Sequence, residues 1–219
     1  MGFFVTNAAR NTSWPITVGA EGIAAAQFAR CGFDVLVQAG RDKSWYDLVV
    51  SRAGSLLKIS VKASDNAQWW LTNGFSRRAQ DLAPNRIDAG SAVNMWLSSY
   101  GSRTVCCLVQ FEGVALHEMP RIYLACPQEI AQCMRETAER SGQCALFERY
   151  DWTDAGGTAH IETLPESWRF SEERIQHLLD QQNTRPVPMI AAVRTNAEPD
   201  AGPIPPKREV VRHDAALSA

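Results

Sequence analysis

The first third of the chain changes from a helical to an alternating pattern of apolar positions. Residues 17–31 are rich in alanine and place apolar residues three and four positions apart, which predicts an amphipathic helix. Thr17 suits its N-cap, and Gly32 suits its C-terminal end. Glu21 falls on the apolar face, which we expect to pack against the core. The other members of that face are Val18, Ala25 and Phe28.

Three strands are predicted after this helix, at 33–37, 45–51 and 55–62. The last two are joined by Ala53-Gly54, and so short a connection makes them an antiparallel hairpin. In the third strand apolar residues alternate with polar ones, which gives the strand one apolar and one polar face. The polar face consists of Lys58, Ser60 and Lys62.

The remaining pattern predicts an α/β fold with a central mixed sheet flanked by helices. Residues 63–90 are loop-rich, and 104–111 form an apolar run typical of a strand buried on both faces. Further helices are expected at 91–100, at 127–140 and after the N-cap residue Ser171, and further strands at 121–125 and 144–150. We expect one domain over residues 1–182. Residues 183–219 hold six of the eleven prolines and no aromatic residue, which predicts a disordered tail.

Composition and charge narrow the function classes. The 219 residues carry a formal charge of −2, which argues against a histone-like coat or a basic membrane binder. A nucleic-acid partner would therefore have to meet a local basic patch. No apolar run reaches the roughly 18 residues that span a bilayer, and no signal-peptide pattern is present.

The six cysteines lack C-x-x-C spacing, and we expect buried free thiols in a cytoplasmic protein. An irregular zinc site made of His117, Cys126 and Cys133 is the alternative.

Candidate chemistry converges on the hairpin. Asp47 lies inside an apolar run, where a carboxylate is costly unless it is paired or binds a cation. When the hairpin closes, Asp47 and Lys62 lie roughly opposite each other, and Glu21 comes from a helix that packs on the same sheet. Two carboxylates and a lysine suit a Mg²⁺ site for phosphodiester hydrolysis. A buried Asp47–Lys62 salt bridge, with Glu21 at the helix boundary, is the alternative.

Five phrases on these elements occur in order along the chain. They are Val18-Gly19-Ala20-Glu21, Gly32-Phe33-Asp34-Val35, Ala39-Gly40-Arg41, Tyr46-Asp47-Leu48-Val49-Val50 and Ser60-Val61-Lys62. The ordered set, over residues 17–64, resembles the PD-(D/E)XK nuclease superfamily. Within it, the set is similar to the archaeal-type Holliday-junction-resolvase branch and the small bacterial endonuclease-like proteins. Tyr46 stands in place of the motif proline, and Ser60 stands in place of the motif acid.

This resemblance implies a restriction-endonuclease-like core and metal-dependent hydrolysis of DNA phosphodiester bonds. Glu21, Asp47 and the main-chain carbonyl of Val61 would hold Mg²⁺ or Mn²⁺, and Lys62 would position the attacking water. Because Ser60 is a weak neutral ligand, two outcomes stay open. One is an active nuclease with a rearranged metal shell, and the other is a catalytically degenerate module that binds nucleic acid or a protein partner. An unrelated interaction or immunity-type protein is the alternative outside the superfamily.

Nucleic-acid contacts are expected from basic residues around this site. These are Arg41, Lys43, Arg52 and Lys58, with Trp45, Trp69 and Trp70 nearby. Basic residues interleaved with aromatic ones suit a groove that follows phosphates. Ordinary surface charge around core tryptophans is the alternative. The expected partner is DNA, either branched or duplex, and a homodimer remains an open option.

Overall fold

The computed structural model describes residues 13–38, 45–73, 89–101, 103–141 and 144–184. Backbone contacts separate residues 1–186 from residues 187–219, and the second group lies outside the described residues. The tail expected over 183–219 lies outside them as well, except that the last helix runs to Thr184. The structure therefore describes most of the predicted domain over residues 1–182, and the disordered tail stays a prediction.

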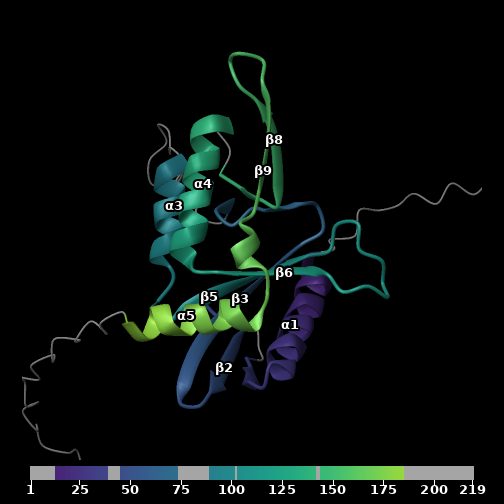
Figure 1. Cartoon of the computed structure of the whole chain (residues 1–219), viewed down its shortest axis with the longest axis vertical. Helices are drawn as coiled ribbons and strands as arrows, with labels where there is room; N and C mark the ends of the chain where they lie inside the picture. The colour runs from purple at the N-terminus through teal and green to yellow at the C-terminus, as the bar shows by residue number, and fades with distance from the viewer. Residues whose placement is uncertain (1–12, 39–44, 74–88, 102, 142–143, 185–219) are drawn as a thin grey trace, which may run out of the picture. The chain divides into compact units, whose positions relative to one another are not determined.

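A five-stranded mixed sheet forms the centre of the described chain (Figure 1). Its strands, in spatial order, are β1 (Asp34–Val37), β2 (Leu48–Arg52), β3 (Ser55–Ser64), β5 (Thr104–Gln110) and β6 (Arg121–Ala125). Neighbours are antiparallel except β3 and β5, which run parallel through a connection that contains a helix. The predicted fold class, α/β with a central mixed sheet flanked by helices, is confirmed.

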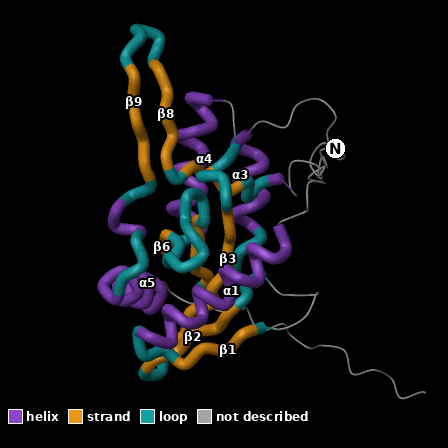
Figure 2. Tube along the Cα trace, turned by 90° about the vertical axis from the view of Figure 1, so that its right-hand side faces the viewer, coloured by secondary structure: helices purple, strands orange, loops and turns teal. Residues whose placement is uncertain are grey.

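Helices cover both faces of this sheet (Figures 1 and 2). The helices α1 (Ser13–Arg30) and α5 (Glu172–Thr184) pack on one face, and α3 (Ala89–Ser98) and α4 (Pro127–Ser141) pack on the other. Every residue of β5 is buried, as its continuous apolar run predicts. Adjacent Cys106 and Cys107 point to opposite faces, one into each apolar core. All six cysteines are free thiols, as expected, but only Cys106, Cys107 and Cys126 are buried.

Helix α1 begins one turn earlier than the sequence predicts, so Thr17 is not its N-cap. Its buried face consists of Ala20, Ala24 and Phe28: Phe28 is buried as predicted, whereas Val18 is 49% exposed. The two alanines let the helix approach the sheet closely, which rotates Glu21 to the half-buried border of that face. The predicted terminator Gly32 adopts a φ of +77°, and its amide bonds the carbonyl of Ala29 at 3.0 Å.

The hairpin of β2 and β3 closes through Ala53 and Gly54, whose φ values are 51° and 81°. Two left-handed residues make the tight turn that matches the twist of the flanking strands. The register pairs Arg52 with Ser55 at the turn and Leu48 with Ile59 at the other end. Because β3 continues to Ser64, its last residues run on past the paired part of β2.

Smaller strands depart from the predicted pattern. The strand expected at 144–150 is two pieces, β7 (Leu146–Phe147) and β8 (Arg149–Thr153). The break falls at Glu148, whose amide donates to Ala67 while its carbonyl accepts from Leu164. The sequence did not predict β4 (Gln68–Trp69), which pairs with β7, β9 (Ala159–Thr163), which pairs with β8, or the short 3₁₀ helix η1 (Glu166–Trp168). The β8–β9 hairpin projects beyond α4 in both ribbon views (Figures 1 and 2).

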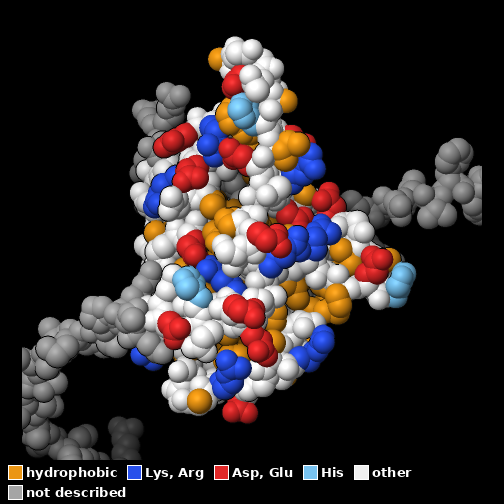
Figure 3. Space-filling model, in the orientation of Figure 1, with side chains coloured by type: hydrophobic (Ala, Val, Ile, Leu, Met, Phe, Trp, Pro, Cys, Tyr) orange, Lys and Arg blue, Asp and Glu red, His pale blue; other side chains and the backbone are white. Residues whose placement is uncertain are grey.

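Of the helices described, none is both long enough and apolar enough to cross a lipid bilayer. On the face shown in Figure 3, acidic and basic side chains are interspersed over the described residues.

Candidate active site

Asp47 lies directly before β2, at the point where β3 extends beyond its pairing with β2 on one edge, while its other edge stays paired with β5. Its amide donates to the carbonyl of Ile59 at 2.7 Å, and its own carbonyl accepts from Gln38 at 2.9 Å. Its carboxylate Oδ2 accepts from the main-chain amide of Val61 at 2.7 Å. The side chain therefore continues the hydrogen-bond ladder by one step and is held at the open edge of β3.

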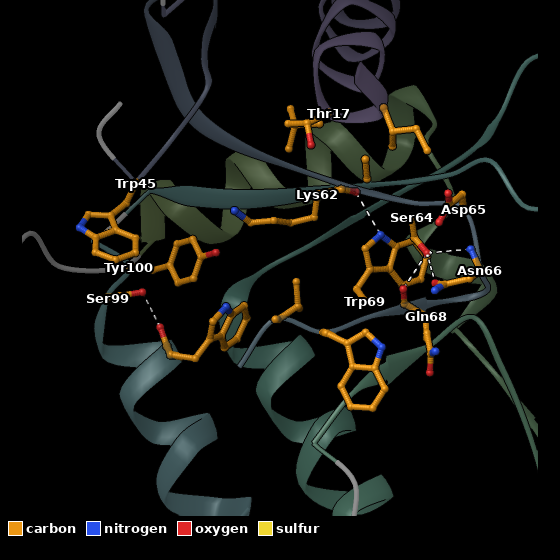
Figure 4. Close-up of a pocket in the computed structure, with 16 residues that line it drawn as sticks. Thr17, Trp45, Lys62, Ser64, Asp65, Asn66, Gln68, Trp69, Ser99 and Tyr100 are labelled. Atoms are coloured by element: carbon orange, nitrogen blue, oxygen red, sulfur yellow. Dashed lines mark hydrogen bonds between the residues drawn. The ribbon is translucent and has the colours of Figure 1, made fainter. Parts of the chain in front are cut away.

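Lys62 follows Val61 on β3 and is half-buried. Its carbonyl accepts a hydrogen bond from the indole Nε1 of Trp69 at 3.1 Å, which fixes the strand at this position. Figure 4 shows the amino end of Lys62 directed toward the side of the pocket where Trp45 and Tyr100 lie. The register that pairs Leu48 with Ile59 puts Asp47 across from Ser60, two residues before Lys62, rather than opposite Lys62 as expected.

A pocket of about 630 Å³ opens at this edge of the sheet. Val61, Lys62 and the residues that follow them on β3 form one wall, and the first turn of α1, with Ile16 and Thr17, forms another. The remaining lining is largely aromatic and includes Trp69, Trp70, Trp96 and Tyr100, and Trp45 lies on the same side as Tyr100 (Figure 4). Sixteen of the described residues line the pocket, and among them Lys62 is basic and Asp65 acidic.

Glu21 and Asp47 do not line this pocket themselves. Asp47 contacts the pocket only indirectly, through the hydrogen bond that its carboxylate accepts from the amide of Val61, a pocket residue. Glu21 lies four residues after Thr17 on α1, and residues so spaced share one side of a helix. Because α1 covers the sheet face opposite the polar side chains of β3, Glu21 and Lys62 belong to different sides of that sheet. The catalytic role of Glu21 stays a prediction.

Ser60, which replaces the motif acid, is 1% exposed and faces the α3 side of the sheet. Its hydroxyl shares a hydrogen bond with Tyr100. Burial raises the pKa of Tyr100 far above its ordinary value, with a further increase from Cys106, while the bond to Ser60 acts to lower it. Tyr100 therefore stays protonated and occupies the space beside the position where the motif carries a carboxylate.

Asp47 and Lys62 both influence the pKa of Cys106, the neighbour of Ser60 on β5. Burial raises the pKa of the Cys106 thiol to about 12. Lys62 acts to lower that pKa, and Asp47 adds to the increase.

The available donors near the edge of β3 are hard oxygen atoms. They are the Asp47 carboxylate, the Val61 carbonyl and the carboxylate of Asp65, which lines the pocket, with Glu21 one turn along α1 from Thr17. Over the described ranges, no three His, Cys, Asp or Glu side chains are grouped as a metal site. Mg²⁺ commonly binds through one or two carboxylates and completes its shell with water and substrate phosphate oxygens. The residues fit an ion shared with substrate, whereas the zinc site from Cys126 and Cys133 is not assembled.

The expected nucleic-acid contacts lie in different places. Arg41 and Lys43 lie outside the described residues. Lys58 is on the same polar row of β3 as Lys62, with its ammonium 5.3 Å from the ring centroid of Tyr46. Arg52 lies at the hairpin turn, where it donates to the carbonyl of Cys31 at 3.0 Å and stacks over Phe33. These four residues remain predicted contacts, and of the two that the structure describes, Arg52 lies farther from the pocket than Lys58 along the hairpin.

Tyr100 and Trp96 are the pocket residues that sequence reasoning did not connect with the site. They come from α3 and the turn after it, about forty positions from β3. The ring of Trp96 meets that of Tyr100 edge-on, with centroids 5.0 Å apart. Their position beside Ser60 depends on the parallel pairing of β3 with β5, which local sequence patterns do not predict.

Comparison with known proteins gives little. No protein-family model matches the chain, and no curated protein gives a significant match. Among solved structures, the chain is similar to a bacterial homing endonuclease with a TM-score of 0.35 and 17% identity. The match covers 77% of this chain and 91% of that one. A likeness at this level supports no inference about activity.

Proposed function

We propose that this chain is a nuclease that hydrolyses DNA phosphodiester bonds with Mg²⁺ or Mn²⁺. The observation that carries the proposal is the Asp47 carboxylate fixed to the amide of Val61, the residue before Lys62, where both Val61 and Lys62 line a pocket. The ordered motif phrases of residues 17–64 add support, since they resemble the PD-(D/E)XK superfamily. Asp47 and the Val61 carbonyl would hold the ion, and Glu21 would join them only by reaching around the edge of the sheet from the α1 side.

The protein groups have separable roles in this proposal. The hydrogen bond from Val61 fixes the Asp47 carboxylate in one rotamer, so little side-chain conformational entropy is lost when an ion binds. The Lys62 ammonium, half-buried in the pocket, orients a water molecule and stabilises the extra negative charge on the phosphate as the bond breaks. When bound, the divalent ion would supply charge neutralisation and acidify water.

Plasmid nicking with purified protein tests the proposal. With Mg²⁺ or Mn²⁺ present, Asp47→Ala and Lys62→Ala should each abolish nicking, because each removes a charge at the reacting phosphate. Asp34→Ala, on the exposed edge strand β1, is the matched control and should nick like wild type. If both site variants cleave as fast as this control, the site assignment is wrong.

A nuclease-derived binding module is the second candidate, and the environment of Ser60 favours it. A buried hydroxyl bonded to Tyr100 leaves the motif position without a negative charge. Calorimetric titration with Mn²⁺ separates the two candidates. Heat of binding that disappears in Asp47→Ala supports the nuclease, and equal absence of heat in both proteins supports the module.

A further inference from the structure

Four of the seven tryptophans in the chain line the pocket that Lys62 enters. Two of them, Trp69 and Trp96, are each only 2% exposed and belong to the core. Trp45 is 60% exposed and Trp70 is 43% exposed. Large aromatic side chains left open to water around one concave site indicate a ligand that covers them.

The inner wall of the pocket is held rigid. The indole of Trp69 donates to the Lys62 carbonyl at 3.1 Å, and Trp96 packs edge-on against Tyr100. A wall fixed in this way loses little entropy when a ligand binds. The exposed faces of Trp45 and Trp70 then add planar apolar surface at the mouth, on which a flat ring can stack.

Polar side chains with both donors and acceptors lie at the rim. Asn66 and Gln68 each carry an amide, which pairs donor with acceptor as the edge of a nucleobase does. Ser64 fixes their loop: its hydroxyl donates to the carbonyl of Gln68 at 2.6 Å and lies 3.1 Å from the Asn66 side chain (Figure 4). The pocket thus combines stacking surfaces, amides and the cation of Lys62.

These three features match the three parts of a nucleotide. Aromatic faces suit the base, amides suit its hydrogen-bonding edge, and Lys62 suits the phosphate. A base inside a duplex is stacked between its neighbours and exposes only its edges, so it does not present a face to Trp45 or Trp70. The pocket volume of about 630 Å³ falls within the range of small-ligand sites.

We propose that the pocket of Lys62, Trp45 and Trp70 receives an unpaired nucleobase, so that the substrate is a single-stranded nucleic acid. The step of strand cleavage rests on the proposed nuclease function, but the binding of the unpaired base does not. The phosphate next to the stacked base lies toward Lys62, which is the side of the pocket nearest to Asp47 and Val61. Selection of single strands thereby precedes cleavage.

The test measures binding without metal. The full-length protein is titrated in EDTA into a single-stranded oligodeoxynucleotide that contains 2-aminopurine, whose fluorescence is quenched when it stacks on tryptophan. The duplex of the same sequence and the matching RNA strand are titrated alongside. The expected result is quenching of the single strand, with an affinity at least about tenfold higher than that of the duplex.

Tryptophan variants localise the binding. Trp45→Ala and Trp70→Ala should each weaken single-strand binding about tenfold, because each removes one stacking surface. Trp45→Phe should keep most of the affinity, since it keeps a planar ring. Trp152→Ala is the matched control, because Trp152 lies on β8 outside the pocket and is stacked on His160. Thermal melts of each variant check folding, and the exposure of Trp45 and Trp70 predicts melts near wild type.

The outcomes separate this inference from the nuclease proposal. Equal affinity for single strand and duplex, or unchanged affinity in Trp45→Ala and Trp70→Ala, overturns the base pocket even where Mn²⁺-dependent cleavage is found. Stacking in EDTA that is lost in both variants supports the base pocket even where no metal yields cleavage, and in that case the nuclease proposal is the one that fails. Stronger quenching with the RNA strand than with DNA identifies RNA as the preferred single strand and equally supports the pocket.

Discussion

The carboxylate of Asp47 accepts a hydrogen bond of 2.7 Å from the main-chain amide of Val61, where β3 runs on beyond β2. One side chain therefore completes the sheet and presents negative charge at its open edge. These two properties depend on different atoms of the residue: the hydrogen bond needs one acceptor oxygen, whereas the charge needs an ionised carboxylate. Substitutions at Asp47 separate them.

Asp47→Asn keeps an acceptor for the Val61 amide but removes the charge. We expect it to lower the free energy of unfolding by less than about 1 kcal/mol, while Asp47→Ala, which leaves the amide without its acceptor, costs about 1–2 kcal/mol. Both variants should lose nicking activity. Urea denaturation and a plasmid assay on the same preparations give the two readouts. Nicking retained by Asp47→Asn would show that the charge of Asp47 is dispensable.

Lys62 and Lys58 share the polar row of β3, which makes them a matched pair. Lys62→Met keeps the aliphatic length, so we expect kcat for DNA cleavage to fall about 10²–10³-fold with a small change in binding. Lys58→Met should leave kcat unchanged and reduce the slope of log K against log[salt] by about 1, the effect of losing one phosphate contact. Single-turnover kinetics and binding at several salt concentrations measure both. The assignment of Lys62 is wrong if the two variants behave alike.

Ser60 offers a direct test of the missing motif acid. Because the site is 1% exposed beside Tyr100, Ser60→Asp should lower the free energy of unfolding by about 2–4 kcal/mol without metal. Where an ion binds at Asp47, Mn²⁺ should raise the melting temperature of Ser60→Asp more than that of wild type, since it neutralises the added carboxylate. The double variant with Asp47→Ala should lose this recovery. Equal recovery in the double variant would place the ion elsewhere.

Local patterns were sufficient for much of the fold. The alternation in β3 predicts its faces, and the apolar run of β5 predicts burial on both sides; each is a property of neighbouring residues. The two-residue turn sets a register that puts Asp47 across from Ser60, so the expected pairing of Asp47 with Lys62 was displaced by two residues. The hydrogen bond from the Val61 amide to Asp47 could not be predicted, because it depends on how far β3 extends beyond the end of β2.

Long-range pairings account for what sequence reasoning missed. Tyr100 reaches Ser60 only because β5 lies parallel to β3, and a sequence pattern does not state which strands become neighbours. The strand expected at 144–150 breaks at Glu148 because that carboxylate is drawn to Arg121 and Tyr123 of β6. A side-chain preference formed across 25 or more positions overrides the local strand pattern there.

The same Glu148 makes stability depend on pH. Its carboxylate accepts from Arg121 at 2.6 and 2.8 Å and from the Tyr123 hydroxyl at 2.7 Å. Burial acts to raise the pKa of Glu148, but the bonds from Arg121 and Tyr123 outweigh it and hold the pKa below the ordinary 4.5. The unfolded chain therefore binds more protons here than the folded one, so this contribution to stability is present above pH 4.5 and is lost as pH falls through the lowered pKa.

Glu148→Gln should therefore destabilise the protein most at neutral pH. Because Arg121 is partly exposed and solvent screens its charge, we expect a loss of about 1–2 kcal/mol in the free energy of unfolding at pH 7. The difference from wild type should shrink as the pH falls below the ordinary 4.5 of a glutamate, because wild type then loses the same charge. Glu166→Gln is the control: its ion pair with Arg169 is solvent-exposed, so its effect should be small at every pH. Denaturant melts across this pH range measure the difference, and a loss in Glu148→Gln that stays constant down to strongly acidic pH would mean that the charge of Glu148 does not stabilise the fold.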